Sequence, residues 1–316
     1  MEYRLLGNTG VKVSRLCMGT MTFGKEADKQ ASTAMFGRCR EAGINFFDCA
    51  NSYAGGESER ILGELIRDCR DEVVITTKVF NRVGTDINAG GGSRRHIMAS
   101  VEASLKRLKT DHIDLYFLHH FDKDADMEDS LRALDDLVRQ GKILYPAASN
   151  YAAWQIMKAR AISLREGWSP FRCIEPMYNL LKRQAEVEIL PMAASEQLGV
   201  ITYGPLAGGL LTGKYMQAVS TGRFIENKTY SIRYDGAQIQ ETVRKFTRFA
   251  QEQGYRAAAL AVAWAGHHPA VTAPIIGARS AEQLEDSLKA LQIDMTPGLY
   301  QQIGGLSITP PLASDR

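Results

Sequence analysis

The stretch Ile44-Asn45-Phe46-Phe47-Asp48-Cys49-Ala50-Asn51-Ser52-Tyr53 decides the fold that this sequence predicts. Its apolar part, residues 44–47, is typical of a short buried strand, and it leads into Asp48. Tyr53 follows in a loop of small residues. A carboxylate buried at the end of a strand is costly unless a cationic group lies beside it. The prediction therefore depends on what the neighbouring strands supply.

The two strands predicted next supply ionisable groups at the same end. Residues 73–77 lead into Lys78, and residues 113–118 lead into His119. The C-terminal ends of parallel strands lie along one rim, which is where (β/α)8 barrels place their chemistry. The sequence therefore predicts that Asp48, Lys78 and His119 meet at one rim.

Strand and helix patterns alternate along the rest of the chain, which favours a parallel sheet. A small β-hairpin is predicted first, at residues 3–13, and eight strand–helix units follow it. This count predicts an α/β fold, a (β/α)8 TIM barrel with extra helices, as one domain over residues 1–316. The eight strands are expected at residues 15–19, 44–47, 73–77, 113–118, 143–149, 173–177, 200–203 and 271–276.

Two segments are predicted to lack regular structure. The first runs from residue 204 to about residue 236, which exceeds ordinary loop lengths, and such loops are usually functional. The second is the tail from residue 309 onward, which contains two prolines and is expected to be loose.

The composition is that of an ordinary globular protein. The chain has 316 residues, 45% hydrophobic and 23% charged, with a net charge of +2, so nothing favours nucleic acid or an acidic membrane surface as a partner. No run of about 18 apolar residues predicts a membrane span, and the first residues lack the pattern of a signal peptide. The five scattered cysteines suit free thiols in a reducing compartment. We therefore expect a cytoplasmic protein.

Two glycine-containing loops late in the chain predict phosphate binding. Residues 203–209 contain three glycines, and glycine lets backbone amides approach a phosphate closely. Residues 277–280 open a predicted helix with Arg279, and a helix N-terminus beside an arginine suits a phosphate monoester. Because the loops after strands seven and eight of barrels often hold phosphate, a phosphate-bearing cofactor would join these loops to the ionisable cluster.

These stretches resemble the aldo-keto reductase superfamily over nearly the whole chain, most closely the branch of bacterial reductases and potassium-channel β-subunits. The resemblance is carried by Phe47-Asp48-Cys49-Ala50 with Tyr53, Thr77-Lys78, Asp114-Leu115-Tyr116 with Leu118-His119, Ser149-Asn150, Tyr178-Asn179, residues 205–214, and residues 276–279 with Gln283-Leu284. It implies a (β/α)8 barrel with the hairpin across its bottom and an extended NADPH across its top. It also implies reduction of aldehydes or ketones to alcohols by hydride transfer.

The same resemblance implies a catalytic tetrad of Asp48, Tyr53, Lys78 and His119. Tyr53 would be the general acid, because a nearby ammonium lowers the pKa of a phenol, and Lys78 would supply that ammonium. Asp48 would hold Lys78 charged and in place. His119 would orient the carbonyl of the substrate as charge develops on its oxygen.

The resemblance also implies the contacts of the cofactor NADP(H). The expected contact residues are Gly19, Thr20, Ser149, Asn150, Glu175, Tyr178, Tyr203, Pro205, Leu206, Gly208, Gly277, Arg279, Gln283 and Asp286. Ser149 and Asn150 would hold the carboxamide of the nicotinamide, and Tyr178 would stack on its ring. The backbone of residues 206–209 would bind the pyrophosphate, and Arg279 the 2′-phosphate.

The sequence departs from the family at the predicted site. Glu175 stands where the family usually has a glutamine that touches the carboxamide, and only a protonated carboxyl could donate the same hydrogen bond. The substrate pocket, for a small carbonyl compound or alcohol, is expected at Met21, Phe23, Phe80 and His120. A homo-oligomer is compatible with the sequence, which does not fix the oligomeric state.

Other functions stay open beside carbonyl reduction. Lys78 could be the nucleophile of a Schiff-base lyase of the barrel aldolase type. The chain could also be an NADPH-binding sensor that docks a partner, as the likeness to channel subunits implies. A metal site is not expected. The acids at 122, 124 and 126 imitate a calcium loop but lack its glycine and glutamate, and residues 208–214 approach a P-loop that Tyr215 fails to complete.

Overall fold

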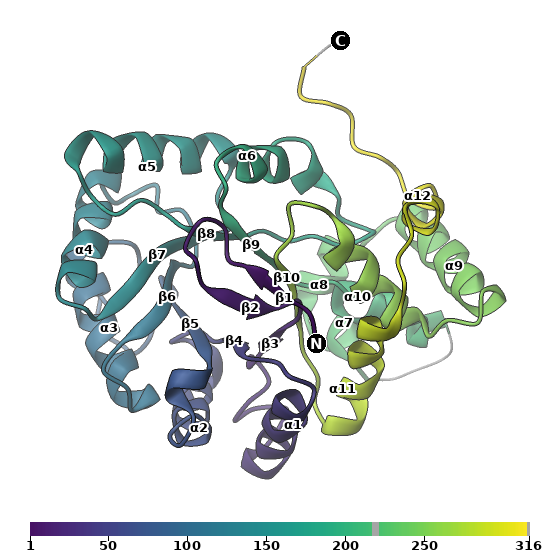
Figure 1. Ribbon diagram of the computed structural model, residues 1–316, viewed down its shortest axis with the longest axis horizontal. Helices are drawn as coiled ribbons and strands as arrows, with labels where there is room; N and C mark the ends of the chain where they lie inside the picture. The colour runs from purple at the N-terminus through teal and green to yellow at the C-terminus, as the bar shows by residue number, and fades with distance from the viewer. Residues whose placement is uncertain (217–220, 315–316) are drawn as a thin grey trace.

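The computed structural model describes residues 1–216 and 221–314 and shows a closed barrel of parallel strands surrounded by helices (Figure 1). The strands close in the order β10-β3-β4-β5-β6-β7-β8-β9. Their bounds are Cys17–Gly19 (β3), Phe46–Asp48 (β4), Val74–Val79 (β5), Ile113–Leu118 (β6), Ile143–Ser149 (β7), Cys173–Glu175 (β8), Gly199–Thr202 (β9) and Ala273–Ile276 (β10). The predicted (β/α)8 barrel is confirmed, and each predicted strand is present.

An antiparallel hairpin, β1 (Tyr3–Leu5) and β2 (Lys12–Ser14), precedes the barrel and lies across its centre in Figure 1. Gly7 turns the chain with a φ of 54°, and a Cβ there would lie 2.5 Å from the backbone nitrogen of Gly199. Because Gly199 is the first residue of β9, the hairpin covers the N-terminal end of the barrel. The predicted position of the hairpin is thus correct.

Side chains alternate between the barrel interior and the outer helices. In β6, Leu115 and Phe117 belong to the apolar cluster inside the barrel, whereas Tyr116 and Leu118 belong to the cluster between strands and helices. This is the period of two that a pleated strand imposes. The interior cluster contains Leu6, Val13, Cys17, Phe46, Val74, Leu115, Phe117, Ala147, Cys173, Ile201 and Ala273. The barrel is therefore filled by apolar side chains between its N-terminal end and its C-terminal rim.

Helices cover the outside of the barrel. Those that follow the strands are Lys29–Glu41 (α1), Glu57–Leu65 (α2), Arg94–Leu108 (α3), Met127–Arg139 (α4), Ala153–Glu166 (α5), Ile189–Ser195 (α6), Ala257–His267 (α10) and Ala281–Leu288 (α11). Extra helices are Arg223–Glu226 (α7), Lys228–Arg233 (α8), Ala237–Glu252 (α9) and Pro297–Gly304 (α12). Asp28, Ser93 and Asp126 cap α1, α3 and α4 with side-chain oxygens that accept first-turn amides.

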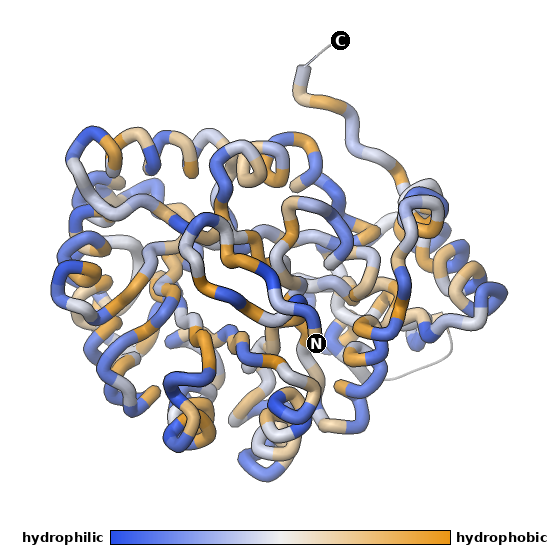
Figure 2. Tube along the Cα trace, viewed as in Figure 1, coloured by the Kyte–Doolittle hydropathy of each residue, from blue (hydrophilic) through white to orange (hydrophobic). Residues whose placement is uncertain are grey.

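Most outer helices alternate hydrophobic and hydrophilic residues, as Figure 2 shows, because one face packs on the barrel and the other faces solvent. Helix α10 is the exception, since residues 258–266 are all buried. It is covered because α9, α11 and α12 contact it as well as β10. Among the helices of the described residues, none is long and apolar enough to cross a membrane.

The segment after β9 is more regular than the sequence predicts. It contains 3₁₀ turns at Ala207–Thr212 and Lys214–Met216, followed by α7 and α8. Helix α8 forms because the side chain of Asn227 accepts the backbone N–H of Thr229, a cap that the prediction overlooked. Residues 217–220 of this predicted segment, and 315–316 of the predicted tail, lie outside the described residues.

Candidate functional site

The polar rim follows directly from the alternation of side chains along the strands. Four strands place a residue of the interior cluster two positions before their last residue, namely Cys17, Phe46, Ala147 and Cys173. The longer β5 places Val74 in the same cluster, two positions before Thr76. The next inward positions at the rim are Gly19 in β3, Asp48 in β4, Thr76 and then Lys78 in β5, Ser149 in β7 and Glu175 in β8. Local strand geometry therefore gathers the predicted polar residues into the mouth of the barrel.

Lys78 lies between two buried carboxylates. Its Nζ donates to Oδ1 of Asp48 over 2.5 Å and to the carbonyl oxygen of Cys49 over 2.9 Å. Oε2 of Glu175 lies 3.3 Å from the same nitrogen. Burial opposes the charge on Lys78, but the two carboxylates outweigh it and raise the pKa of Lys78 well above its ordinary value. Lys78 is therefore an ammonium ion.

Glu175 is less well compensated than Asp48. Its side chain is 4% exposed, and among the described residues its Oε2 has no hydrogen-bond partner despite the short distance to Lys78. Burial and, to a smaller extent, the Asp48 carboxylate raise the pKa of Glu175 to about 8, although the Lys78 ammonium acts in the opposite direction. Glu175 therefore changes its charge near neutral pH.

Tyr53 is held at the rim by a tight turn. It begins the 3₁₀ turn Tyr53–Gly56, in which Ala54 has a φ of 48° and Gly55 a φ of 65°. Nζ of Lys78 lies 5.3 Å from the centre of the Tyr53 ring. Burial raises the pKa of Tyr53 above its ordinary value, although the Lys78 ammonium acts in the opposite direction. The effect predicted for Lys78 thus has the expected sign, but burial outweighs it.

His119 is neutral and has a defined hydrogen-bond partner. Its ring centre lies 6.2 Å from that of Tyr53. Burial, together with the charge of Lys78, lowers the pKa of His119 to about 2. Nδ2 of Asn81 lies 3.2 Å from Nδ1 of His119. Because an amide nitrogen only donates, Nδ1 accepts, and the ring proton is then on Nε2. His119 can therefore offer a hydrogen bond to an oxygen but holds no second proton.

Asn81 contacts His119, a relationship that the sequence analysis did not predict. It follows β5 by two residues, and its Nδ2 also lies 3.4 Å from Oγ of Ser52. The only signal in the sequence was its position just after the strand that carries Lys78. Nothing local predicts that the loop folds back onto His119.

The residues predicted for the substrate pocket differ in their burial. His120 stacks on His119 with ring centres 4.9 Å apart, and Phe80 meets His120 edge to face at 5.3 Å. Met21 is half-buried. Phe23 is fully buried in the cluster between the strands and the helices, so it cannot line an open pocket and that prediction is wrong.

Tyr178 differs from its predicted place, whereas Tyr203 lies at the rim. Tyr178 is fully buried, stacks on Trp264 at 5.3 Å and donates its hydroxyl to Glu186 over 2.7 Å. No face of this ring is open, which contradicts its expected stacking on a nicotinamide. Tyr203 is half-buried, and its hydroxyl donates to Oδ1 of Asn150 over 2.7 Å. The rim tyrosine of this region is therefore Tyr203.

Ser149, Asn150 and Thr20 surround the rim cluster. Nδ2 of Asn150 donates to Oγ of Ser149 over 3.0 Å and to the carbonyl oxygen of His119 over 3.0 Å. The Thr20 side chain is fully buried and donates to the carbonyl oxygen of Asp48 over 2.9 Å. Because Thr20 as a whole has no exposed surface, its position contradicts the predicted contact with a cofactor.

The two predicted phosphate loops lie beside the helices α7 and α8. Gly208 has a φ of 67°, and a Cβ there would lie 2.5 Å from the ring of Tyr230 in α8. Arg279 donates from Nη2 to Oε2 of Glu226 in α7 over 3.1 Å, and its backbone N–H donates to the side chain of Gln283 over 2.8 Å. Helices α7 and α8 thus connect the loop after β9 to the loop after β10.

The remaining predicted cofactor residues lie around these loops. Leu206 is half-buried and Pro205 is buried. A Cβ at the exposed Gly277 would meet only the carbonyl oxygen of Gly19, at 3.8 Å, so the surface between the loops after β3 and β10 is open. Asp286 lies 3.6 Å from Nε of Arg256, further along α11.

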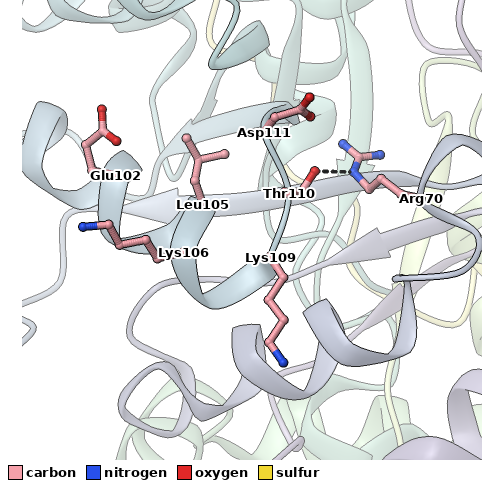
Figure 3. Close-up of a pocket in the computed structure, with 7 residues that line it drawn as sticks. All are labelled: Arg70, Glu102, Leu105, Lys106, Lys109, Thr110 and Asp111. Atoms are coloured by element: carbon pink, nitrogen blue, oxygen red, sulfur yellow. Dashed lines mark hydrogen bonds between the residues drawn. The ribbon is translucent and has the colours of Figure 1, made fainter.

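A shallow pocket lies far from this rim (Figure 3). It is lined by Arg70, Glu102, Leu105, Lys106, Lys109, Thr110 and Asp111, between the end of α3 and the start of β6. Arg70 is already engaged there, because it donates to Asp114, Thr110 and two carbonyl oxygens. No group of three histidines, cysteines or acids within residues 1–216 and 221–314 could hold a metal ion.

The barrel, the ionisable cluster at its C-terminal rim and the glycine-bearing loops beside it define a barrel protein of the oxidoreductase class. Residues 15–307 match the sequence model of the Aldo/keto reductase family. The chain belongs to this family.

Three relatives illustrate the range of the family around this chain. An uncharacterized oxidoreductase of Bacillus subtilis, YrpG, is 37% identical over 97% of this chain and 96% of its own length. A probable voltage-gated potassium channel subunit beta of Oryza sativa is 35% identical over 98% of each chain. The norsolorinic acid reductase of Aspergillus flavus is 34% identical over 95% of this chain and 80% of its own length.

Proposed function

We propose that this chain reduces aldehydes or ketones to alcohols with NADPH, and that Tyr53 donates the proton. The observation that carries the proposal is the buried Lys78 ammonium, 2.5 Å from Asp48 and 5.3 Å from the centre of the Tyr53 ring. A buried ion pair stabilises a fold only weakly, so its placement beside a tyrosine and a histidine favours a role in chemistry.

The residues present fit a dinucleotide. Gly208 and Gly209 have φ angles of 67° and 95°, which glycine adopts without strain, and Nζ of Lys214 would lie 3.3 Å from a Cβ at Gly209, so a cation lies beside this loop. Gly277 is exposed at the start of α11 and leaves room beside Gly19. Oε2 of Glu175 is a buried oxygen without a hydrogen-bond partner among the described residues, so it can accept or share a proton with a ligand. The cofactor, when bound, supplies the hydride.

The side chains of the rim would supply the proton and the geometry. Tyr53 has a raised pKa and is therefore protonated at neutral pH, as a general acid must be. After the proton leaves, the Lys78 ammonium stabilises the phenolate that remains. His119 donates from Nε2 to the substrate oxygen and positions it. Help of this kind from a general acid typically contributes ~100- to 10,000-fold in rate.

The other rim residues would position the cofactor. Ser149 and Asn150 would bind the carboxamide, and Tyr203, in place of the buried Tyr178, would stack on the nicotinamide ring. The backbone of residues 206–209 would bind the pyrophosphate, and Arg279 the 2′-phosphate. Gln283 and Asp286 would contact the adenosine, while Phe80 and His120 would line the substrate pocket.

A Schiff-base lyase fits the site poorly. The nucleophile of such an enzyme is a neutral amine. Lys78 has a pKa raised well above its ordinary value by two carboxylates, so its amine is protonated. A sensor that binds NADPH and docks a partner remains a second candidate, supported by the 35% identity to a probable potassium channel subunit beta.

The test follows the absorbance of NADPH with a reactive aromatic aldehyde, for the wild type and for Tyr53→Phe. We expect oxidation by the wild type, at least ~100-fold less by the variant, and equal quenching of protein fluorescence by NADPH in both. Equal turnover in the two proteins would exclude Tyr53 as the acid. Quenching without turnover in the wild type would favour the sensor, and absence of quenching would refute NADPH binding.

A further inference from the structure

The rim holds one more carboxylate than its cation requires. Lys78 is paired with Asp48 at 2.5 Å, and Glu175 approaches the same nitrogen only to 3.3 Å. Strands β5 and β8 are not neighbours in the barrel, so Glu175 reaches Lys78 across the interior. When both carboxylates are ionised, this buried cluster carries a net negative charge.

The other groups that face Glu175 do not neutralise this charge. They are Cys17 on β3, Cys173 on β8, Tyr53 after β4 and Tyr203 after β9, each of which feels the Glu175 carboxylate as a like charge when it ionises. Ser149 of the neighbouring β7 donates its hydroxyl to the backbone carbonyl of Glu175 and not to its carboxylate. His119 is neutral. Among the residues that the structure describes, Lys78 alone therefore offers Glu175 a positive charge, and a bound cationic ligand would add another.

We propose that Glu175 makes the site distinguish the oxidised from the reduced nicotinamide, by holding a carboxylate against the cationic ring of NADP⁺ and a protonated carboxyl against the neutral ring of NADPH. The inference rests on the function proposed above. It assigns to Glu175 a binding role that depends on the charge of the ring.

The position of Glu175 supports this role. A ring that delivers hydride to a carbonyl held between Tyr53 and His119 must lie over the adjacent rim. Glu175 in β8 lies opposite Ser149 in β7. Asn150, which follows Ser149, accepts a hydrogen bond from the hydroxyl of Tyr203. Glu175 is thus the last residue of β8 at the rim where such a ring would sit, and its Oε2 is buried without a hydrogen-bond partner among the described residues.

Proton linkage follows from the charge of the ring. A buried carboxylate without full compensation is costly, and a cationic ring beside it removes part of that cost. NADP⁺ that binds to the protonated site releases one proton from the Glu175 carboxyl to solvent. NADPH leaves that proton in place, where the carboxyl can donate it to the oxygen of the carboxamide. No electron is exchanged in either step.

The titration of Glu175 sets the pH range of the effect. Because burial raises the pKa of Glu175 to about 8, the carboxyl is largely protonated in the free protein at neutral pH. Below that pKa the affinity for NADP⁺ should rise with pH, by up to about tenfold per pH unit, whereas the affinity for NADPH should not. The 2′-phosphate titrates alike in both nucleotides, so its contribution cancels in the ratio of the two dissociation constants. The dependence of this ratio on pH therefore reports the titration of Glu175.

The experiment measures the dissociation constants of NADP⁺ and NADPH by fluorescence quenching from about pH 6.5 to about pH 9. In the wild type, the ratio of the NADP⁺ constant to the NADPH constant should fall by up to about tenfold per pH unit, below the pKa of Glu175 because NADP⁺ binds more tightly and above it because NADPH binds more weakly. In Glu175→Gln the ratio should be independent of pH, and at the alkaline end NADP⁺ should bind about tenfold more weakly than to the wild type.

A matched control is Glu226→Gln, which removes a carboxylate at the opposite end of the proposed cofactor site. Because Glu226 pairs with Arg279, this change should alter both dissociation constants by the same factor and leave their ratio dependent on pH as in the wild type. Calorimetry of the wild type in two buffers of different ionisation enthalpy measures the released proton directly, so the inference does not depend on how well a variant folds.

The outcomes separate this inference from the function on which it rests. If both nucleotides bind and the ratio is the same in wild type and Glu175→Gln, or if NADP⁺ binds to the wild type without releasing a proton, Glu175 does not discriminate and the inference is overturned while the cofactor assignment stands. If neither nucleotide binds, the proposed function is overturned and this inference with it.

Discussion

The Lys78 ammonium and the Asp48 carboxylate lie 2.5 Å apart inside the barrel, with side chains that are 0% and 3% exposed. Thr76, which faces Asp48 in the β4–β5 register, donates its hydroxyl to the same carboxylate oxygen over 2.5 Å. The pair is therefore fixed by two adjacent strands. Removal of one partner from such a buried pair leaves an uncompensated charge, which is far more costly than the absence of the whole pair.

Replacement of Lys78 by methionine should both destabilise the protein and abolish reduction. Asp48 and Glu175 would then be buried without a cation, which should lower the free energy of unfolding by about 3–5 kcal/mol. Urea denaturation near neutral pH measures this loss. The double variant Lys78→Met/Asp48→Asn should recover most of the stability and none of the activity. A single variant as stable as the wild type would show that the pair is not buried in solution.

Asn81 should act on the reaction through His119. Asn81→Ala removes the donor that holds Nδ1 as an acceptor, so the ring loses its fixed tautomer, and we expect kcat to fall about tenfold, the value of one hydrogen bond. Asn81→Asp should reduce kcat further, because a carboxylate accepts from Nδ1–H and moves the proton away from Nε2.

Nitrogen NMR of the His119 ring reports the tautomer independently of activity. The wild type should show a proton on Nε2, and Asn81→Asp a proton on Nδ1. Asn88→Ala is the matched control, since Asn88 is an exposed asparagine of the same loop. An unchanged tautomer in Asn81→Asp would show that this contact does not orient His119.

The rim residues on neighbouring strands were predictable because strands impose a period of two. Once residues 44–48 and 73–78 are strands that run parallel, their last inward positions must be adjacent, and these are Asp48 and Lys78. The contact between Lys78 and Glu175 was not predictable, because it crosses the interior and depends on the closure of the barrel.

The predictions that failed concern loops and their packing. Tyr178 directly follows the predicted strand 173–177, and Tyr203 ends the predicted strand 200–203. Nothing local shows that Trp264 of α10 covers Tyr178. Phe23 lies in a loop after β3 but is buried under the helices. In each case the side chain is placed by an element far along the chain, which sequence patterns do not reveal.

Arg279 and Glu226 should set the preference for the phosphorylated cofactor. Arg279→Ala should weaken the binding of NADPH about tenfold or more and leave the binding of NADH nearly unchanged, because only NADPH carries the 2′-phosphate. Glu226→Gln frees the guanidinium and should tighten NADPH binding about two- to fivefold. Titrations at low and high salt check the electrostatic origin. Equal effects on both cofactors would place the 2′-phosphate elsewhere.

Glu175 should also give the stability of the protein a characteristic dependence on pH. Burial raises the pKa of Glu175 from an ordinary 4.5 to about 8 in the folded state. Between these values the folded chain holds a proton that the unfolded chain has lost, so the proton stabilises the folded state. This contribution is fully present below about pH 4.5 and is lost as the pH rises through about 8.

The free energy of unfolding of the wild type should therefore fall across this window, by at most about 1.4 kcal/mol per pH unit from this one group. Glu175→Gln has no proton to lose, so it should lack this part of the slope and be more stable than the wild type at the alkaline end. Urea denaturation at several pH values gives both curves. The slope of the unfolding free energy against urea concentration should stay constant with pH, which checks two-state behaviour. If the unfolding free energies of the wild type and of Glu175→Gln depend on pH in the same way, Glu175 is ionised in the folded protein throughout the window. Only a carboxyl that keeps its proton to a higher pH in the folded state than in the unfolded state can make the two curves differ.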